Sequence, residues 1–198
     1  MTWVKVCGLT RIEDIAAAEA AGADAIGLVL VPESPRAITV DRAAELAAAV
    51  TTSAVLLTKD FLPEDLVAAA LAVGVDAVQL YGDHASESAE MAAAVGLFVL
   101  RPVEVDFELA LIPEAHVPLF DNRSGSNFGG SGLPFDHHLV PITDRRFVLA
   151  GGLGPDNVAD AIRATRPWGV DASSRLETRP GVKDHDLIAR FVREAKQA

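Results

Sequence analysis

Residues 22–31 read GADAIGLVLV, and this stretch decides the fold class. Its apolar residues run almost without polar alternation, which is typical of a strand that is covered on both faces in a parallel sheet. The glycine in front of them suits the end of an Ala-rich helix. The same Gly-x-Asp-Ala pattern starts again at Gly74 and Gly169, so the sequence indicates a helix-to-strand unit that repeats along the chain.

Short apolar runs recur through the whole chain and alternate with helix-like stretches. A capping-box pattern at residues 10–13 predicts a helix to about residue 21, and Pro63 is a favoured first helical residue. Further helices are expected near residues 86–95 and 184–196. The expected strands lie at residues 4–7, 25–31, 54–57, 77–80, 97–100, 117–120, 147–150 and 168–171.

The number of units favours a closed barrel. Eight strands in 198 residues leave about 25 residues for each βα unit, which is room for little else. We therefore predict an α/β protein made of a single (β/α)8 TIM-barrel domain over residues 1–198. A doubly wound open sheet is the structural alternative. In a barrel, functional residues belong on the loops that follow the C-terminal ends of the strands.

The composition excludes several classes of protein. The chain has 17 Lys and Arg against 28 Asp and Glu, a net charge of −11, which argues against a nucleic-acid partner. The longest uncharged apolar run, residues 91–100, is half as long as a membrane span, and the N-terminus lacks a signal-peptide pattern. The single cysteine excludes an internal disulfide and fits a reducing compartment. We expect a cytoplasmic protein with no membrane partner.

Two residues at strand ends are candidates for chemistry. Cys7 ends the first strand, and Lys5 shares its side of that strand, so we expect the ammonium group to favour a thiolate. Asp121 directly follows the strand at residues 117–120, where a barrel keeps its functional groups. Each has an ordinary alternative role, which is a small buried side chain for Cys7 and a turn or helix-cap residue for Asp121.

Glycine- and hydroxyl-rich segments indicate a phosphate site. Gly151 and Gly152 leave one strand towards a helix with Pro155 in its first turn, and Ser173 and Ser174 end the last strand. Backbone N–H groups, hydroxyls and a helix N-terminus together bind anions without a lysine. The ends of the seventh and eighth strands are also the usual phosphate position in barrels.

Two further loops complete the predicted site. Arg36 is suited to hold a carboxylate through two parallel hydrogen bonds, although a surface arginine is the ordinary alternative. The loop at residues 124–132, which contains Gly130, is rich in glycine and serine. Its composition is typical of a loop that orders around an anionic ligand.

These segments, in this order, resemble phosphoribosylanthranilate isomerase, an enzyme of tryptophan biosynthesis. The resemblance spans nearly the whole chain, and its first, second and last segments are the specific ones. The matching segments are KVCGLT at 5–10, PESPR at 32–36, QL at 79–80, Asp121 with GGSG at 129–132 and FD at 135–136, AGGL at 150–153, Pro155 with NV at 157–158, GVD at 169–171, SS at 173–174 with Glu177, and PG at 180–181 with KD at 183–184.

The resemblance implies an isomerase that rearranges N-(5′-phosphoribosyl)anthranilate without a metal or an organic cofactor, as a monomer or a homodimer. It makes Asp121 the general acid at the ribose ring oxygen and Cys7 the general base at C2′, with the pKa of the acid raised and that of the base lowered. The substrate-binding residues that it implies are Arg36 for the carboxylate, Gly152, Ser173 and Ser174 for the phosphate, and Gly130 and Gly151 beside them.

Four residues depart from the family pattern: Tyr81 in place of a typical His, Lys59 and Arg101 at strand ends, and Arg175 in place of a glycine. All four are expected at the catalytic mouth, where they would change the substrate or simply pair with Glu33, Asp60 and Asp83. The alternatives to the family reaction are therefore an isomerase for another aminated sugar phosphate and a non-catalytic ligand-binding barrel. Retention of both the acid and the base favours isomerase chemistry.

Overall fold

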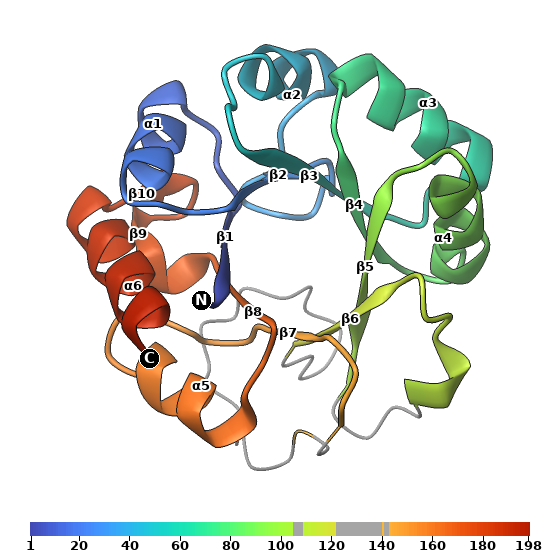
Figure 1. Cartoon of the computed structure of the whole chain (residues 1–198). Coiled ribbons are helices and arrows are strands. Elements are labelled where there is room, and N and C mark those ends of the chain that lie inside the picture. Colours follow the sequence, from blue (N-terminus) through green and yellow to red (C-terminus); the bar gives the residue numbers. More distant parts are fainter. Residues whose placement is uncertain (105–108, 122–139, 141–142) are drawn as a thin grey trace.

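The structure is a computed structural model that describes residues 1–104, 109–121, 140 and 143–198. Its strands pair in parallel and in chain order, and they close into a barrel because β1 pairs with both β2 and β8 (Figure 1). The predicted (β/α)8 barrel is confirmed, and the open-sheet alternative is wrong. The strands are β1 (Trp3–Cys7), β2 (Ala25–Val29), β3 (Ser53–Lys59), β4 (Ala77–Tyr81), β5 (Phe98–Val103), β6 (Val117–Phe120), β7 (Val148–Leu149) and β8 (Gly169–Ala172).

The helices lie outside the ring of strands (Figure 1). Pro63 begins α3 as predicted, and Gly74 ends it in the left-handed conformation with φ 76°. Asp184 caps α6, since its carboxylate accepts hydrogen bonds from the N–H groups of Asp186 and Leu187. The helices are α1 (Ile12–Ala20), α2 (Val40–Ala47), α3 (Pro63–Val73), α4 (Ala85–Ala94), α5 (Val158–Thr165) and α6 (His185–Gln197), with 3-10 helices η1 (Leu109–Leu111) and η3 (Ser174–Leu176).

Two predicted helix starts are wrong. No capping box opens α1, because the Thr10 hydroxyl donates to the carbonyl of Gly181 at 2.6 Å instead of capping the helix. Pro155 does not lie in the first turn of α5, which begins three residues later at Val158. The intervening turn is closed by Asn157, whose side-chain oxygen accepts the N–H of Gly154 at 2.8 Å.

The three Gly-x-Asp-Ala patterns are not equivalent in the structure. After Gly22 and Gly74 the strand begins at the alanine, whereas β8 begins at Gly169 itself. This glycine is required by packing, because a Cβ atom there would lie 2.7 Å from the ring of Trp3. The shift carries Asp171 into the strand, opposite Lys5 of β1, so the third aspartate reaches the barrel interior.

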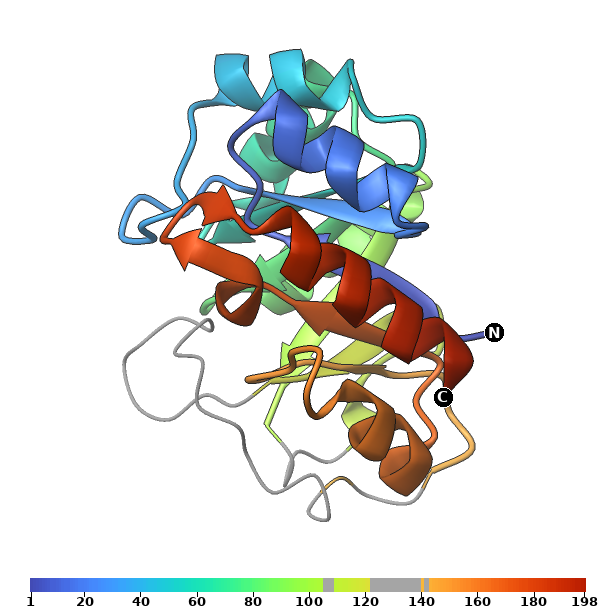
Figure 2. The ribbon, with the colours of Figure 1, turned by 90° about the vertical axis from the view of Figure 1, so that its left-hand side faces the viewer.

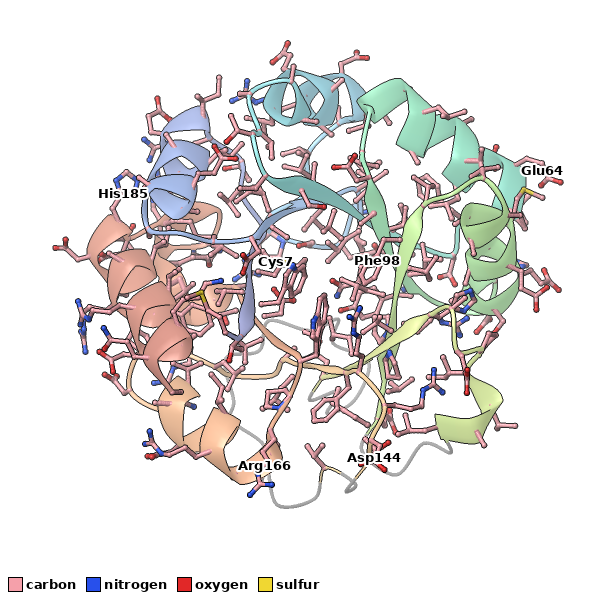
Figure 3. The ribbon with its side chains drawn as sticks, viewed as in Figure 1. Cys7, Glu64, Phe98, Asp144, Arg166 and His185 are labelled. Carbon is pink, nitrogen blue, oxygen red and sulfur yellow. The ribbon has the colours of Figure 1, made fainter. Side chains whose placement is uncertain are left out.

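Alternation along the strands divides the apolar core in two. One face of each strand packs against the helices, as Val4 and Val6 do in β1. The other face fills the barrel interior, where Cys7 lies (Figure 3). At the N-terminal end of the barrel, Trp3 stacks on Trp168 with ring centroids 4.9 Å apart. Polar groups of the interior therefore collect towards the opposite, C-terminal end.

An antiparallel hairpin that the sequence reading missed follows η3. It consists of β9 (Glu177–Arg179) and β10 (Val182–Lys183), and it lies at the end of the molecule away from the N-terminus (Figure 2). The hairpin thus sits on the side where the barrel strands end. Among the residues that the structure describes, no helix has the length and apolar character needed to cross a membrane.

Candidate active site

One pocket at the C-terminal ends of the barrel strands gathers the predicted site residues. It is lined by Cys7 from β1, Asp121 after β6 and Arg36 from the loop after β2. Seven of the eight predicted residues line it, and Gly130 lies outside the described residues. The lining members are Cys7, Arg36, Asp121, Gly151, Gly152, Ser173 and Ser174.

Cys7 is the last residue of β1 and is only 6% exposed. Burial raises the pKa of its thiol; the positive charges of Lys5 and Lys183 oppose this rise, and the negative charge of Asp171 adds to it. The lowered pKa that the resemblance implied for the base is therefore not what the buried thiol shows. Lys5 does favour the thiolate, but desolvation outweighs it.

Lys5 is fully buried inside the barrel and bound to two side chains. Its ammonium donates to Asp171 Oδ2 at 2.9 Å and to Gln79 Oε1 at 3.0 Å. Burial acts to lower the pKa of Lys5, but attraction by Asp171 and by the Cys7 thiolate raises it overall. The lysine therefore stays charged directly beneath the thiol. Neither Gln79 nor Asp171 was recognised from sequence as part of the polar site.

Asp121 directly follows β6 and is 7% exposed. The hydroxyl of Tyr81 donates to Asp121 Oδ2 at 3.4 Å, and the same hydroxyl oxygen accepts the Nε2–H of Gln79 at 2.7 Å. Gln79 and Tyr81 are two residues apart in β4 and therefore share its inner face, which is why both reach the pocket. Asp121 is thus held at the pocket wall by a buried polar neighbour.

Arg36 is held by a carboxylate from the unpredicted hairpin. Its Nε and Nη2 atoms each donate to Glu177 at 2.7 Å, and Lys183 donates to the same carboxylate at 2.8 Å. Burial acts to raise the pKa of Glu177, but the hydrogen bonds from Arg36 and Lys183 lower it overall. Gly8 makes room for this arrangement, because a Cβ atom there would lie 2.4 Å from the Arg36 side chain.

The glycine and serine residues form a second wall of the pocket. Gly151 and Gly152 both adopt positive φ, 82° and 67°, a conformation that glycine tolerates best. The Ser173 hydroxyl donates to the carbonyl of Cys7 at 2.9 Å, and Lys183 donates to the carbonyl of Ser173 at 3.0 Å. The candidate phosphate wall is therefore tied to the strand that carries the thiol.

Only one of the four departures from the family pattern lines the pocket, and that one is Tyr81. Arg101 is on the outer face of β5 and donates to the carbonyl of Ala85 at 3.1 Å, towards α4. Arg175 donates to the carbonyl of Gly152 at 3.3 Å, behind the glycine loop. The expectation that all four lie at the catalytic mouth is therefore wrong for Arg101, and Arg175 lies beside the pocket without lining it.

Lys59 lies at the end of β3 and pairs with the predicted acids Glu33, at 4.0 Å, and Asp60, at 3.7 Å. The third predicted acid, Asp83, instead uses its backbone N–H to donate to Asp60. In the described part of the chain, no three His, Cys, Asp or Glu side chains gather closely enough to hold a metal ion.

The class of protein follows from the fold and the pocket. It is a (β/α)8-barrel enzyme suited to acid–base chemistry, because one pocket holds a thiol, a carboxyl group and Gly/Ser loops. The comparisons give the family. The profile described as N-(5′-phosphoribosyl)anthranilate (PRA) isomerase matches residues 4–194, and the chain belongs to that family.

Relatives and solved structures agree with this assignment. The N-(5′-phosphoribosyl)anthranilate isomerase of Rubrobacter xylanophilus is 40% identical over 206 residues, covering 99% of this chain and 100% of the relative. The phosphoribosyl anthranilate isomerase of Thermotoga maritima superposes with a TM-score of 0.90 at 37% identity, with full coverage of both chains. A phosphoribosyl anthranilate isomerase in complex with reduced 1-(o-carboxyphenylamino)-1-deoxyribulose 5-phosphate gives a TM-score of 0.87 at 35% identity, again over both full chains.

Proposed function

We propose that this chain catalyses the Amadori rearrangement of N-(5′-phosphoribosyl)anthranilate to 1-(2-carboxyphenylamino)-1-deoxyribulose 5-phosphate in tryptophan biosynthesis. The observation that carries the proposal is that Cys7 and Asp121 line one pocket together with Arg36 and the Gly/Ser wall. Such a pocket offers an acid, a base, a cation for a carboxylate and N–H or hydroxyl donors for a phosphate. Membership of the isomerase family supports the same reaction.

In this proposal Asp121 protonates the ribose ring oxygen, and the C1′–O bond breaks as the anthranilate nitrogen forms an iminium at C1′. The Cys7 thiolate then takes the proton from C2′. The C–H electron pair forms the C1′=C2′ bond and neutralises the nitrogen. The enol gives its hydroxyl proton to the Asp121 carboxylate and receives a proton at C1′ from the Cys7 thiol. C2′ is oxidised and C1′ reduced, so the rearrangement balances without a cofactor.

The thiolate is the reactive form of Cys7, and the pocket has to supply it. Burial acts to hold the pKa of Cys7 above its ordinary value, so neighbouring positive charge has to favour its ionisation. Lys5 and Lys183 are the two cations whose charge favours ionisation there. We assign them this electrostatic role beside the base.

The two ends of the substrate are assigned to different groups of the pocket. Arg36 uses Nε and Nη2 for Glu177, so the N–H groups of Nη1 are the ones we assign to the anthranilate carboxylate. The N–H groups of Gly151 and Gly152 and the hydroxyls of Ser173 and Ser174 are assigned to the phosphate. Gly130 is assigned to the substrate as well, on the family resemblance alone.

The remaining proposals concern the whole protein. We propose one domain over residues 1–198, a cytoplasmic location, and a monomer or a homodimer. The partner is a small phosphorylated molecule, and no nucleic acid is expected because the net charge is −11. Three of the departing residues lie outside the pocket lining, which favours the family's substrate over an altered one.

The decisive experiment is turnover of freshly generated phosphoribosylanthranilate, followed by the loss of its fluorescence. We expect turnover by the wild type and a fall in kcat of about 10²- to 10⁴-fold in both Cys7→Ser and Asp121→Asn. Asp83→Asn, which removes an exposed carboxylate near the same end of the barrel, is the matched control and should keep wild-type kcat. No turnover by a well-folded wild type would overturn the proposal and point to another aminated sugar phosphate.

A further inference from the structure

A chain of hydrogen bonds crosses the barrel interior from β1 to the end of β6. Lys5 Nζ donates to Gln79 Oε1 at 3.0 Å, Gln79 Nε2 donates to Tyr81 Oη at 2.7 Å, and Tyr81 Oη donates to Asp121 Oδ2 at 3.4 Å. All four side chains are less than 9% exposed. The chain thus joins the cation beside the proposed base to the proposed acid.

The direction of every bond in this chain is fixed by its first member. An ammonium group can only donate, so the oxygen of the Gln79 amide must face Lys5 and its NH2 group must face Tyr81. The Tyr81 oxygen therefore accepts a hydrogen bond from Gln79. The Tyr81 hydroxyl in turn donates its own proton to Asp121 Oδ2.

We propose that Tyr81 is a positioning residue for the general acid: its hydroxyl donates to Oδ2 of Asp121 and orients the carboxyl group that protonates the ribose ring oxygen. The inference rests on the proposed function, in which Asp121 is that acid. The distance of 3.4 Å between Tyr81 and Asp121 is long for a hydroxyl donor, and bonds of this kind in unliganded enzymes tighten when substrate binds.

The same hydrogen bond gives the inference a second, pH-dependent consequence. A donor to a carboxylate favours the ionised form, so removing the Tyr81 hydroxyl moves the ionisation of Asp121 to higher pH. Within the described part of the chain, the other charged or titratable groups facing this corner are Lys5 and Cys7 from β1, Asp171 from β8, Arg36 from the loop after β2, and Lys59, which pairs in register with Tyr81. Tyr81 is the group that donates a hydrogen bond to Asp121 Oδ2.

The test uses two opposite changes at this one position. Tyr81→Phe removes the hydroxyl. Because the sequence has a single tyrosine, biosynthetic replacement of tyrosine by 3-fluorotyrosine alters Tyr81 alone, and its more acidic phenol is a stronger donor. Two quantities are measured: the pH profile of kcat, and the NMR titration of the Asp121 carboxyl carbon in unliganded protein. Asp121→Asn identifies that carbon signal by its loss.

We expect Tyr81→Phe to lower kcat about tenfold and to move the Asp121 titration, with the kinetic limb that coincides with it, to higher pH by about one pH unit. Fluorotyrosine moves both to lower pH. Glu64→Gln, which removes an exposed charge in the first turn of α3, leaves both unchanged and serves as the control. The fluorotyrosine protein keeps every side chain in place, so the inference is testable even where Tyr81→Phe folds poorly.

A fall in kcat in Tyr81→Phe with both titrations unmoved would overturn the inference and reduce Tyr81 to a structural role. A wild type that leaves phosphoribosylanthranilate unchanged would overturn the proposed function instead. In that case the carboxyl titration still decides whether Tyr81 controls Asp121, because it needs no turnover.

Discussion

Asp171→Asn is the substitution that best isolates the electrostatics beneath the thiol. The change keeps the size and shape of the side chain and removes one charge. Asp171 Oδ2 accepts from the fully buried Lys5, while Oδ1 is buried and, in the described structure, has no hydrogen-bond partner. The asparagine oxygen can still accept from Lys5, but the ammonium then loses the counter-charge of Asp171. Its amide NH2 takes the place of Oδ1, where no acceptor is recorded.

The expected cost in stability follows from this geometry. Breaking a buried ion pair costs about 3–5 kcal/mol, and the retained hydrogen bond to Lys5 places Asp171→Asn at the lower end, about 3 kcal/mol. For a chain of this size each kcal/mol moves Tm by about 2–4 °C, so we expect a fall of about 6–12 °C. Differential scanning calorimetry measures it.

Asp171→Asn should shift the pKa of Cys7 in the opposite direction from a substitution that removes the charge of Lys5. The charge of Asp171 contributes to the raised pKa of Cys7, so its removal lets the thiol ionise at lower pH. Lys5→Met removes a charge that lowers the pKa of Cys7, so it should push ionisation to higher pH. Because Cys7 is the only cysteine, thiolate ultraviolet absorbance reports it directly once the Cys7→Ser baseline is subtracted. Asp171→Asn with unchanged or later ionisation of Cys7 would refute the reasoning.

The pH dependence of wild-type stability checks the sign of both shifts. The pKa values of Cys7 and Lys5 are raised in the folded protein, so each group stabilises the fold below its unfolded value and loses that contribution as the pH rises through its folded value. Tm should therefore fall as the pH rises above about 9, the ordinary cysteine value. In Asp171→Asn the folded pKa of Cys7 moves towards its unfolded value, so the part of the fall due to Cys7 should be smaller.

Two further substitutions test the walls of the pocket. Glu177→Gln weakens the hydrogen bonds that hold Arg36 and Lys183. Because this disturbs substrate binding and not proton transfer, we expect KM to rise about tenfold with a smaller change in kcat. A fall in kcat at constant KM would contradict this assignment. Arg175→Gly removes a side chain that donates to the carbonyl of Gly152 without lining the pocket. Steady-state kcat/KM should therefore stay within about twofold, and Tm should fall by about 2–4 °C. A tenfold loss of kcat/KM would mean that Arg175 reaches the substrate.

The sequence was sufficient to predict the barrel and the neighbourhood of the site. Unalternated strands spaced by helices allow few architectures, and parallel strands in a barrel all end at the same rim. Cys7, Asp121 and Ser173 are far apart in sequence but each follows or ends a strand, so the closed barrel brings them to one pocket. No detailed contact was needed for that step.

The polar interior could not be derived in the same way. Lys5 and Asp171 are charged residues in otherwise apolar strands, which signals a buried pair, but their pairing requires β1 to lie beside β8. That neighbourhood exists only once the barrel closes. The shifted start of β8 at Gly169 also hid Asp171, because the same four-residue pattern lies at the start of the strand after Gly22 and Gly74.

The hairpin was missed because its strands are too short to show a period. β9 has three residues and β10 has two, so neither alternation nor length marks them. The outward direction of Arg101 was missed as well, because the unbroken apolar run before it does not show which residues face inward. Its neighbour Leu100 faces the barrel interior, and alternate residues of a strand face opposite sides.

The charged residues around the pocket orient the groups that bind the substrate, and do not attract it by net charge. Lys5, Arg36 and Lys183 are buried cations, and the carboxylates of Asp171 and Glu177 neutralise two of the three charges. What remains is far less than the charge of a phosphate and a carboxylate together, so net charge cannot hold the substrate. Directed donors must hold it, and the ion pairs serve to fix them: Glu177 aims Arg36, and Lys183 ties the Ser173 backbone. The hairpin that carries Glu177 and Lys183 is therefore the element on which the geometry of both walls depends.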